Sequence, residues 1–528
     1  MLGKWSSYSR WILACGLFCS SLCGVRAADS WLWAKNIGGM WGACVGVDGA
    51  GNAYVLGQFL GQETNGGVTL QPQSNTANGF LVKYDPSGTL RWTRQVGAID
   101  RAMCVDVGGN VYLAGYIAGK AKIGNVDLQS QTNRQVIFAA RYDTEGQVLW
   151  ARKAGEADEA SVMCVAVDAA GNYYLAGRAN GKVSFEGVGS QSSGTNGMFV
   201  AKYSGNGALL WKRTEGGTTN NTVSVDDMVV SAVGECFIMG SVNWAENSTT
   251  IGGTKIDRRG PPPKFVGKLI GQGEFEWVRE MNVALDGFFP LGSLALDQAA
   301  NVYVVGNFVR NVQIANAGLS STNTSDFYMA KVDRGGNLAW ARTGGLCCEN
   351  DVRGVAVDRD GNLNVTGTFS FHLPLATDQF IQRINPVVMK YSQSGELLGE
   401  ESGTGNLQGN DIAIDSTGNL VAAGVLYLNG TLGQTQISAD ATTGFDGFIA
   451  KLRPFVRAGI ARVQLIGQKE VRISVQGFAE SNYRIETSTN LLQWASFLTW
   501  PGANGVFEFS DFPTPNTPPK FYRIITLP

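Results

Sequence analysis

Acidic residues recur just before a series of short apolar runs, at intervals of about 60 residues. Carboxylates gathered around one channel mouth would concentrate cations or a basic ligand there. Acids on separate loops are usually only solvated. We treat the set as a candidate ligand-binding ring. Its acids are Asp100, Asp158, Glu159, Asp226, Asp227, Asp286, Glu349, Asp351 and Asp411.

Two adjacent cysteines, Cys347 and Cys348, lie among these acids. Residues 1–27 have the features of a signal peptide, and an exported protein meets an oxidising compartment, in which a vicinal disulfide is one outcome. A reduced or merely structural pair is the alternative that we favour. Both residues remain in the candidate ligand-binding set.

A second pattern, Asp-x-x-Gly-Asn, separates pairs of short apolar runs. Asp and Asn oxygens are calcium ligands, but the same residues cap tight turns, in which Gly or Asn adopts a positive φ. We favour turn formation and predict no cofactor, with calcium as the alternative. The Asp members are Asp48, Asp106, Asp168, Asp297, Asp358 and Asp415.

A basic residue also recurs at one position of the repeated pattern. These residues would form an anion-binding belt, or each would pair locally at a sheet edge, which is the interpretation that we favour. The seven residues are Lys83, Arg141, Lys202, Lys268, Lys331, Lys390 and Lys451.

The sequence contains few of the residues and motifs that several enzyme classes require. His372 is the single histidine and lies in an apolar FHLPL stretch, which argues against a multi-histidine metal site or a Ser-His relay. The motifs G-x-S-x-G and H-E-x-x-H and a phosphate-binding loop are absent. A hydrolase that uses two carboxylates stays open, because acids are plentiful.

These candidate residues belong to a sequence repeat. One phrase, such as GVDGAGNAYVLG, occurs seven times and predicts a β-hairpin in each copy. A third strand follows in each repeat, as in GFLVKYD at 79–85. We number the repeats 1 to 7 by the position of the first phrase, which covers 46–57, 105–115, 165–177, 229–240, 294–306, 355–367 and 412–424.

A predicted fourth strand contains a tryptophan in five of the seven repeats. Repeats 1 to 5 carry Trp92, Trp150, Trp211, Trp277 and Trp340. Repeat 6 has Gly399 there, and repeat 7 ends before such a strand. The missing strand is SWLWAKN, with Trp33, at the start of the chain. We therefore predict an all-β, seven-bladed β-propeller of four-stranded blades, closed by an N-terminal strand so that no sheet edge stays open.

The consensus GVAVDxxGNxYxxG…FxxKYDxxGxLxWAR resembles the SBBP-type β-propeller repeat of secreted bacterial proteins. The resemblance covers roughly residues 29–455. It implies a propeller fold and export, and it implies no particular reaction. Repeat 4 departs most, with Ser231 and Glu235 in place of the Asp and the Asn.

The chain ends are predicted to differ from the repeats. Residues 1–27 have a basic start, a short apolar run and a Val-Arg-Ala site, which indicates a signal peptide cleaved near Ala27. Residues 28–455 form the propeller, and residues 456–528 form a small C-terminal β-sandwich. The chain has 69 glycines, 16% charged residues and a net charge of −2, which suits a turn-rich β protein without a nucleic-acid footprint.

We expect an exported binding or scaffold protein, secreted, periplasmic or at the cell surface, without a membrane span. Its partner would be an extracellular or envelope protein, a peptide or a glycan that contacts the loops of variable sequence. One alternative is an enzyme, either a glycan hydrolase or lyase or a quinoprotein-like oxidoreductase. The other is a purely architectural surface protein.

Overall fold

The computed structural model describes part of the chain, and the predicted signal peptide lies outside that part. It describes residues 31–527 apart from 40, 73–77, 97–101, 119, 131–133, 186–187, 192–195, 219–220, 245–247, 258–262, 282–291, 322–324, 345–348, 375–379, 440–443, 455–458, 467–469, 478–481, 489–492, 501–504 and 512–520. The described residues belong to two compact units, Trp31–Pro454 and a second that includes Phe455–Pro528.

Each repeat supplies strands of fixed order, because its apolar runs are separated by turn residues. The first strands are β2 (Trp41–Val47), β8 (Ala102–Val105), the later part of β13 (Val148–Val167), β18 (Asn221–Val230), β24 (Gly292–Leu296), β30 (Glu349–Val357) and β34 (Thr404–Ile414). The second strands are β3 (Ala53–Phe59), β9 (Val111–Ala118), β14 (Tyr173–Phe185), β19 (Cys236–Trp244), β25 (Val302–Phe308), β31 (Leu363–Pro374) and β35 (Leu420–Leu432).

The outer half of each repeat follows the same order. The third strands are β6 (Asn78–Tyr84), β12 (Gln135–Tyr142), β16 (Gly197–Tyr203), β22 (Lys264–Ile270), β28 (Asp326–Val332), β32 (Phe380–Tyr391) and β37 (Phe445–Leu452). The fourth strands are β7 (Leu90–Val96), the early part of β13, β17 (Leu209–Glu215), β23 (Glu274–Met281), β29 (Leu338–Gly344), β33 (Leu397–Ser402) and β1 (Trp31–Gly38).

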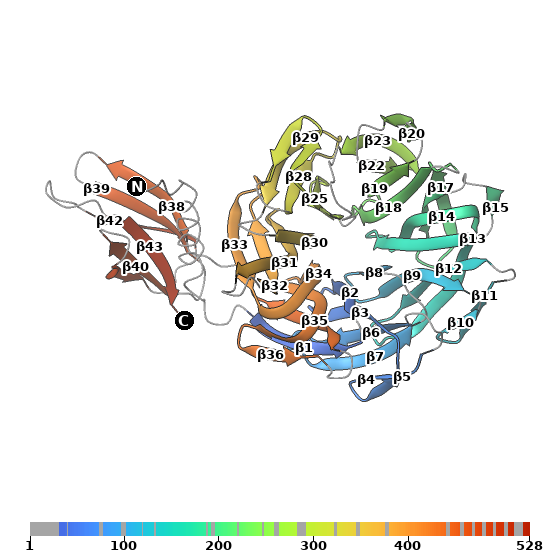
Figure 1. Ribbon diagram of the computed structural model, residues 1–528, viewed down its shortest axis with the longest axis horizontal. Coiled ribbons are helices and arrows are strands. Elements are labelled where there is room, and N and C mark those ends of the chain that lie inside the picture. The colour runs from blue at the N-terminus through green and yellow to red at the C-terminus, as the bar shows by residue number, and fades with distance from the viewer. Residues whose placement is uncertain are drawn as a thin grey trace, which may run out of the picture. The chain divides into compact units, whose positions relative to one another are not determined.

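The repeats form a β-propeller. Within each repeat the strands pair antiparallel in the order first, second, third, fourth. Figure 1 shows the sheets around a common centre, with the first strands innermost. The hairpin predicted across each Asp-x-x-Gly-Asn turn is present, for example between β2 and β3.

The blades are not all separate, and on this point the prediction of seven independent four-stranded blades is wrong. Repeats 1, 4, 5, 6 and 7 form five sheets of their own. Repeats 2 and 3 share one eight-stranded sheet, because β13 runs without a break from the fourth strand of one repeat into the first strand of the next. Residues Gly155–Ala157 of β13 pair with both β12 and β14.

The N-terminal strand completes repeat 7. Strand β1 pairs antiparallel with β37, with Trp33 opposite Lys451 and Asn36 opposite Phe448. The two partners are separated by more than 400 residues in the chain, so this pairing joins its beginning to its last repeat. The predicted closing role of SWLWAKN is confirmed in this pairing.

The core lies between neighbouring sheets. Aromatic side chains from adjacent repeats meet there, for example Trp33 and Tyr84 with ring centroids 6.0 Å apart, and Phe327 and Tyr391 at 6.3 Å. A cluster that contains Trp33, Val55, Tyr84 and Ile449 fills the space between repeats 7 and 1. Large aromatic rings dominate such cores because each one buries a large apolar area.

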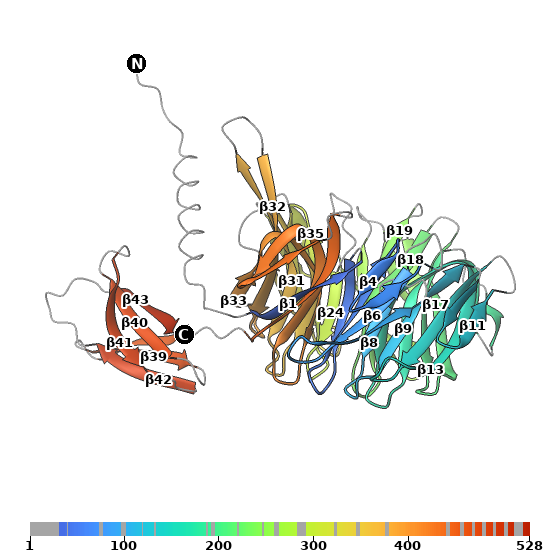
Figure 2. The same ribbon diagram turned by 90° about the horizontal axis from the view of Figure 1, so that it is seen from below.

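Short strands extend the connections between the second and third strands. They are β4 (Glu63–Asn65) with β5 (Val68–Leu70), β10 (Lys120–Ile123) with β11 (Val126–Gln129), β20 (Ser248–Ile251) with β21 (Thr254–Asp257), β26 (Asn311–Ile314) with β27 (Ala317–Ser320), and the single strands β15 (Val188–Gln191) and β36 (Thr435–Ser438). In repeat 6 the connection is instead a long hairpin of β31 and β32, which projects beyond its neighbours in Figure 2 and whose first strand includes His372.

The second unit contains two three-stranded antiparallel sheets. One joins β38 (Gly459–Ile466), β39 (Glu470–Gly477) and β42 (Gly505–Asp511), and the other joins β41 (Ala495–Trp500), β40 (Asn482–Ser488) and β43 (Phe521–Leu527). Phe497 and Tyr522 of the second sheet contact Phe509 of the first, with ring centroids 5.8 and 6.4 Å apart.

Candidate functional site

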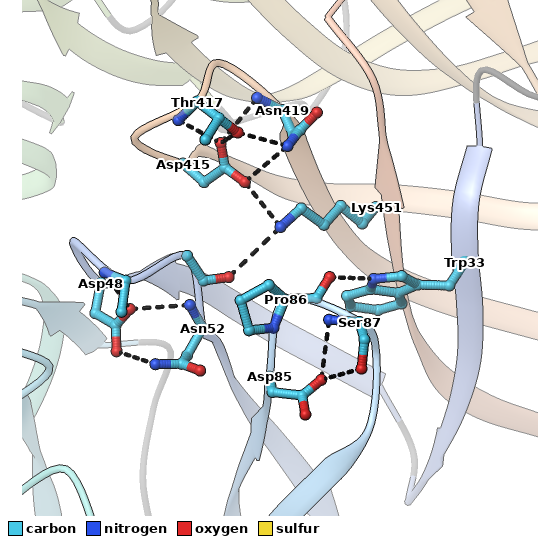
Figure 3. A network of polar contacts seen from close by, with 12 residues as sticks. Trp33, Asp48, Asn52, Asp85, Pro86, Ser87, Asp415, Thr417, Asn419 and Lys451 are labelled. Carbon is cyan, nitrogen blue, oxygen red and sulfur yellow. Dashed lines mark hydrogen bonds and ion pairs between the residues drawn. The ribbon is translucent and has the colours of Figure 1, made fainter.

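One end of the propeller carries the Asp-x-x-Gly-Asn turns, and their polar atoms serve the turns themselves. The carboxylate of Asp48 accepts hydrogen bonds from the backbone N–H groups of Ala50 and Asn52 at 3.0 and 2.9 Å, and from the Asn52 side chain at 2.7 Å (Figure 3). Gly51 has a φ of +83°. The turn interpretation is therefore confirmed. Among the described residues, no group of three or more His, Cys, Asp or Glu side chains is arranged to hold a metal ion.

Six of the recurring basic residues pair locally with a turn carboxylate, as predicted, and Lys83 donates instead to the Thr144 carbonyl of repeat 2 at 2.8 Å. Lys451 Nζ lies 2.7 Å from Asp415 Oδ2 and 3.5 Å from the Gly51 carbonyl of the next repeat (Figure 3). Burial opposes ionisation of Asp415, but hydrogen bonds from Lys451, Thr417 and Asn419 lower its pKa to about 2. The equivalent pairs Lys202–Asp168, Lys331–Asp297 and Lys390–Asp358 are 3.3, 3.1 and 2.9 Å apart.

Repeat 4 keeps this pair although its sequence departs from the pattern. Its carboxylate is supplied by Glu235, at the Asn position, and Ser231 stands where the other repeats have Asp. Lys268 Nζ lies 2.8 Å from Glu235, and Arg334 of repeat 5 lies 2.7 Å from the same oxygen. The acid has moved along the turn, and the ion pair remains.

The tryptophans of the fourth strands bind the neighbouring repeat at the same end. In five of them the indole Nε1 donates to a backbone carbonyl in the turn before the next fourth strand, whereas Nε1 of Trp211 has no hydrogen-bond partner among the described residues. The pairs are Trp33 to Pro86, Trp92 to Thr144, Trp150 to Gly205, Trp277 to Arg334 and Trp340 to Gln393, at 2.9 to 3.1 Å. The side chains at this end are thus largely engaged in contacts within the turns, within a repeat or with the neighbouring repeat.

The opposite end of the innermost strands differs from repeat to repeat, and a β-bulge shapes it. Register shifts lie between Gly42 and Cys44, Val162 and Cys164, Val225 and Asp227, Val352 and Gly354, and Gly409 and Asp411. A bulge re-aims the side chain of the extra residue. That residue is Ala43, Met163, Asp226, Arg353 or Asn410 in these repeats, so polar and charged groups concentrate in repeats 4, 6 and 7.

Five members of the candidate set lie where the structure shows no side chain. Asp100, Asp286, Cys347 and Cys348 are outside the described residues, and for Glu349 only the backbone in β30 is described. The prediction for these residues therefore stays a prediction.

The other acids have basic or backbone partners. Asp158 lies 2.8 Å from Arg134, and Glu159 lies 4.0 Å from Arg178. Asp351 lies 2.7 Å from Arg353. This end of the propeller is a mixed polar surface rather than a ring of acids alone.

The first polar group, which we call the Asp226 cluster, consists of Ser224, Asp226, Ser241 and Lys264. The hydroxyls of Ser224 and Ser241 donate to Asp226 Oδ1 at 2.8 and 3.1 Å. Lys264 Nζ lies 4.0 Å from Oδ2, which accepts no hydrogen bond from the described residues. Burial raises the pKa of Asp226 and lowers that of Lys264, against their mutual attraction.

The second polar group, the Arg353 cluster, consists of Asn307, Asp351, Arg353 and Asn410. Arg353 Nε donates to Asp351 at 2.8 Å, and its Nη1 donates to the Asn410 side chain at 3.3 Å. Asn307 donates to the other oxygen of Asp351 at 2.8 Å. The guanidinium is held in a fixed orientation by three repeats, since Asn307, Asp351 and Asn410 come from repeats 5, 6 and 7.

Two further aspartates lie at one register of the innermost strands. Asp227 Oδ2 accepts a hydrogen bond from the Leu294 N–H at 2.7 Å, and Asp411 Oδ2 accepts one from the Val45 N–H at 2.8 Å. Burial raises the pKa of Asp227 to about 6 and that of Asp411 to about 7. These acids therefore bind backbone groups of neighbouring repeats.

Reasoning from the sequence missed the basic and amide members of both clusters, namely Lys264, Arg353, Asn307 and Asn410. Lys264 departs from the repeat at its position, where the other repeats have small or apolar residues, and Arg353 lies at the bulge position, whose residue type differs from repeat to repeat. A comparison of the repeats position by position would have revealed them.

Comparisons with known proteins give distant relatives. No protein-family model matches the chain. It is 22% identical over 587 residues to an uncharacterized WD repeat-containing protein of Acanthamoeba polyphaga mimivirus, which covers 88% of this chain and 42% of that protein. It is 30% identical over 212 residues to the regulatory protein FlaEY of Caulobacter vibrioides, which covers 37% of this chain and 21% of that protein. The chain thus spans less than half the length of both curated relatives.

Two solved structures show a weak likeness. The Pan2 WD40 domain of Neurospora crassa has a TM-score of 0.38 and 10% identity, covering 79% of this chain and 91% of that one. A puromycin hydrolase has a TM-score of 0.38 and 13% identity, covering 83% and 59%. The fold assignment rests on the strand topology: the protein is a β-propeller built from sequence repeats.

In the part of the chain that the structure describes, no helix has the length and apolar character that a membrane crossing requires.

Proposed function

We propose that the protein is an exported, non-enzymatic binding or scaffold protein, and that its ligand contacts the end of the innermost strands that carries the Asp226 and Arg353 clusters. The observation that carries the proposal is the contrast between the two ends. The turn end repeats the same contacts between neighbouring repeats, whereas the other end presents different polar groups in different repeats. Variable groups on a rigid scaffold are the usual location of a binding site.

The chemistry of the two clusters favours a hydroxyl-rich or zwitterionic ligand, such as a glycan or a peptide. Each cluster brings an acid and a base together with hydroxyl or amide groups from different strands, and sugars and peptides offer matching donors and acceptors. Asp226 Oδ2 is buried and has no hydrogen-bond donor among the described residues, and buried oxygens of this kind usually have a partner. We include no nucleic acid among the partners, because the net charge is −2.

The finer features of the architecture belong to the same proposal. We count the eight-stranded sheet as two blades joined through β13, which gives seven blades. We place the repeats with the SBBP type, and we interpret the two C-terminal sheets as a sandwich that packs through Phe497, Phe509 and Tyr522. Residues 1–27 act as the signal peptide in this proposal.

A glycan-active hydrolase or lyase is the second candidate. It is favoured by the buried pair of Asp226 and Lys264, because side chains with perturbed pKa values cluster at catalytic sites. The quinoprotein-like alternative depends on Cys347 and Cys348, which lie outside the described residues. The architectural alternative requires no ligand at either cluster.

A thermal-shift screen of residues 28–528 tests the proposal. The panel would hold neutral and charged oligosaccharides, peptides, divalent cations and redox cofactors, and a ligand of the native state must raise the unfolding midpoint. We expect a hit that is lost in Arg353→Ala and Asp226→Asn and kept in Glu145→Ala, which changes an exposed acid at the turn end. A hit kept in all three variants would place the site elsewhere, and turnover of a bound glycan would favour the enzyme.

A further inference from the structure

Two repeats carry an aspartate where the others do not, at one position of the innermost strands. Asp227 on β18 and Asp411 on β34 each follow the bulge residue directly. Cys44, Cys164 and Gly354 hold this position in repeats 1, 3 and 6. The two carboxylates are therefore additions to the repeat pattern, and the pattern itself does not require them.

Each of these carboxylates bridges two sheets. Asp227 accepts hydrogen bonds from the Met228 N–H at 2.8 Å on its own strand, and from the Leu294 N–H at 2.7 Å and the Ser293 hydroxyl at 3.0 Å on β24. Strands β18 and β24 belong to different sheets, so the carboxylate links repeat 4 to repeat 5.

Asp411 makes the equivalent bridge at the closure of the ring. It accepts hydrogen bonds from the Ile412 N–H at 2.8 Å on its own strand and from the Val45 N–H at 2.8 Å on β2. This contact joins repeat 7 to repeat 1, at the centre of the ring. The pairing of β1 with β37 supplies the outer strand of repeat 7.

We propose that Asp227 and Asp411 are proton-controlled bridges, which hold neighbouring repeats together most firmly in acidic solution and loosen as the pH rises toward neutrality. The geometric basis is that each carboxylate lies half-buried between two innermost strands and accepts hydrogen bonds from backbone N–H groups of both. Their response to protons follows from what surrounds them.

The surroundings disfavour the charged form. Burial is the largest influence and raises the pKa of both groups, while the backbone N–H groups lower it in part. Asp226 further raises the pKa of Asp227, and Asp227 raises that of Asp411. Within the described residues, neither carboxylate forms an ion pair. The charge of Asp227 does act on one basic residue, since it raises the pKa of Lys264.

Other titratable side chains lie on the strands packed against β18 and β34. Among the residues with described side chains they are Cys44 on β2, Arg152, Lys153, Glu156, Asp158, Glu159 and Cys164 on β13, Tyr173, Tyr174 and Arg178 on β14, Lys202 and Tyr203 on β16, Cys236 on β19, Asp351 and Arg353 on β30, Lys390 and Tyr391 on β32, and Tyr427 on β35. Asp351 and Arg353 pair with each other, and Lys202 and Lys390 pair with turn carboxylates.

The direction of the effect follows from these pKa values. Both groups have a folded-state pKa above the ordinary value of 3.8. Their contribution to stability is fully present below about pH 4. It is lost as the pH rises, through about 6 for Asp227 and about 7 for Asp411. Each group lowers the folding equilibrium constant by up to about tenfold per pH unit in this window.

The test measures stability and local opening together between pH 4.5 and pH 8.5. Denaturant unfolding of the chain gives the equilibrium constant, and hydrogen exchange with mass spectrometry follows the peptides that contain Val45 and Leu294, corrected for the intrinsic pH dependence of exchange. We expect the wild-type chain to lose stability with rising pH and both peptides to exchange faster. Asp411→Asn and Asp227→Asn, which keep an acceptor oxygen without a charge, should flatten this dependence.

Asp158→Asn serves as the control, because it removes a more exposed acid that pairs with Arg134. The proposal is overturned if the asparagine variants keep the wild-type pH dependence, or if the control loses it equally. Should an asparagine variant fail to fold, the wild-type exchange data decide alone. Protection of the Val45 and Leu294 peptides that stays constant from pH 5 to pH 8 contradicts the proposal, and protection that falls there more than in other innermost strands supports it.

Discussion

The indole Nε1 of Trp33 donates a 3.1 Å hydrogen bond to the carbonyl of Pro86, and this bond joins repeat 7 to repeat 1 (Figure 3). Gly88 of the same turn has a φ of +81°, and a Cβ at that position would lie 2.7 Å from the Trp33 ring. The turn therefore needs glycine for two reasons, its backbone conformation and the close approach of the indole.

Removing this one hydrogen bond should weaken the ring closure. Trp33→Phe keeps most of the buried ring but leaves the Pro86 carbonyl without its donor, and we expect a loss of about 1 kcal/mol in the free energy of unfolding. Trp211 has the same register in repeat 3, but its Nε1 is buried without a hydrogen-bond partner in the described residues. Trp211→Phe should therefore be neutral or stabilising. Denaturant titrations check both, and an equal loss in the two variants would contradict the role of the hydrogen bond.

Lys451 and Asp415 form a buried ion pair, with side chains only 3% and 2% exposed. Lys451→Met leaves a buried charge without its partner, for which we expect a loss of about 3–5 kcal/mol in the free energy of unfolding at neutral pH. Adding Asp415→Asn should restore part of the loss. A double variant no more stable than Lys451→Met would show that the lysine acts through packing alone.

The same pair predicts how the protein unfolds in acid. The folded-state pKa of Asp415, about 2, lies below its ordinary value of 3.8, so its contribution is present above about pH 4 and is lost as the pH falls toward 2. Unfolding followed by tryptophan fluorescence between pH 5 and pH 1.5 measures this. The wild type should show a steep loss of stability below pH 4, and Lys451→Met a shallower one. Parallel curves would contradict the assignment.

In repeat 4 the turn carboxylate is at the position of Glu235, and two substitutions should return it to the position of Ser231, where the other repeats have Asp. Glu235→Asn removes a carboxylate shared by Lys268 and Arg334 and leaves Lys268 only Glu276, at 2.7 Å, so we expect a loss of about 1–3 kcal/mol in the free energy of unfolding. Adding Ser231→Asp recreates the turn of the other repeats, in which the acid faces the lysine, and should recover most of the loss. Thermal unfolding of the three proteins decides this, and no recovery in the double variant would mean that the strands of repeat 4 accept only the displaced acid.

Ala300 stands where six repeats have glycine, and its φ is +60°. An L-residue in this region costs about 1–2 kcal/mol, so Ala300→Gly should raise the free energy of unfolding by about 1 kcal/mol. The reverse change, Gly418→Ala at a φ of +89° with its nearest contact at 3.4 Å, should lower it by a similar amount. Destabilisation by Ala300→Gly would show that burial of the methyl group outweighs the backbone strain.

The sequence alone predicted the propeller, because each repeat encodes its structure locally. Asp48 and Gly51 determine a turn within five residues, and alternating apolar residues determine the strands beside it. The closing strand was also predictable. Only six fourth strands occur within the seven repeats, and the strand of Trp33 before the first repeat supplies the missing one. Local pairing of the recurring basic residues was likewise predicted, because a basic residue and a turn carboxylate return at the same spacing in most repeats.

Contacts between repeats were decided by the tertiary structure alone. No local pattern indicates that β13 continues unbroken from repeat 2 into repeat 3, because the absence of a turn after Gly155 leaves the path of the backbone open. Nor does the sequence show that Asp226 lies beside Lys264, or that Asp411 binds the backbone of Val45, 366 positions away. These contacts depend on bulges that shift the register by one residue, and such a shift changes which side chains face a neighbour. The fold follows from periodic local rules, and the candidate site from the places where individual repeats depart from them.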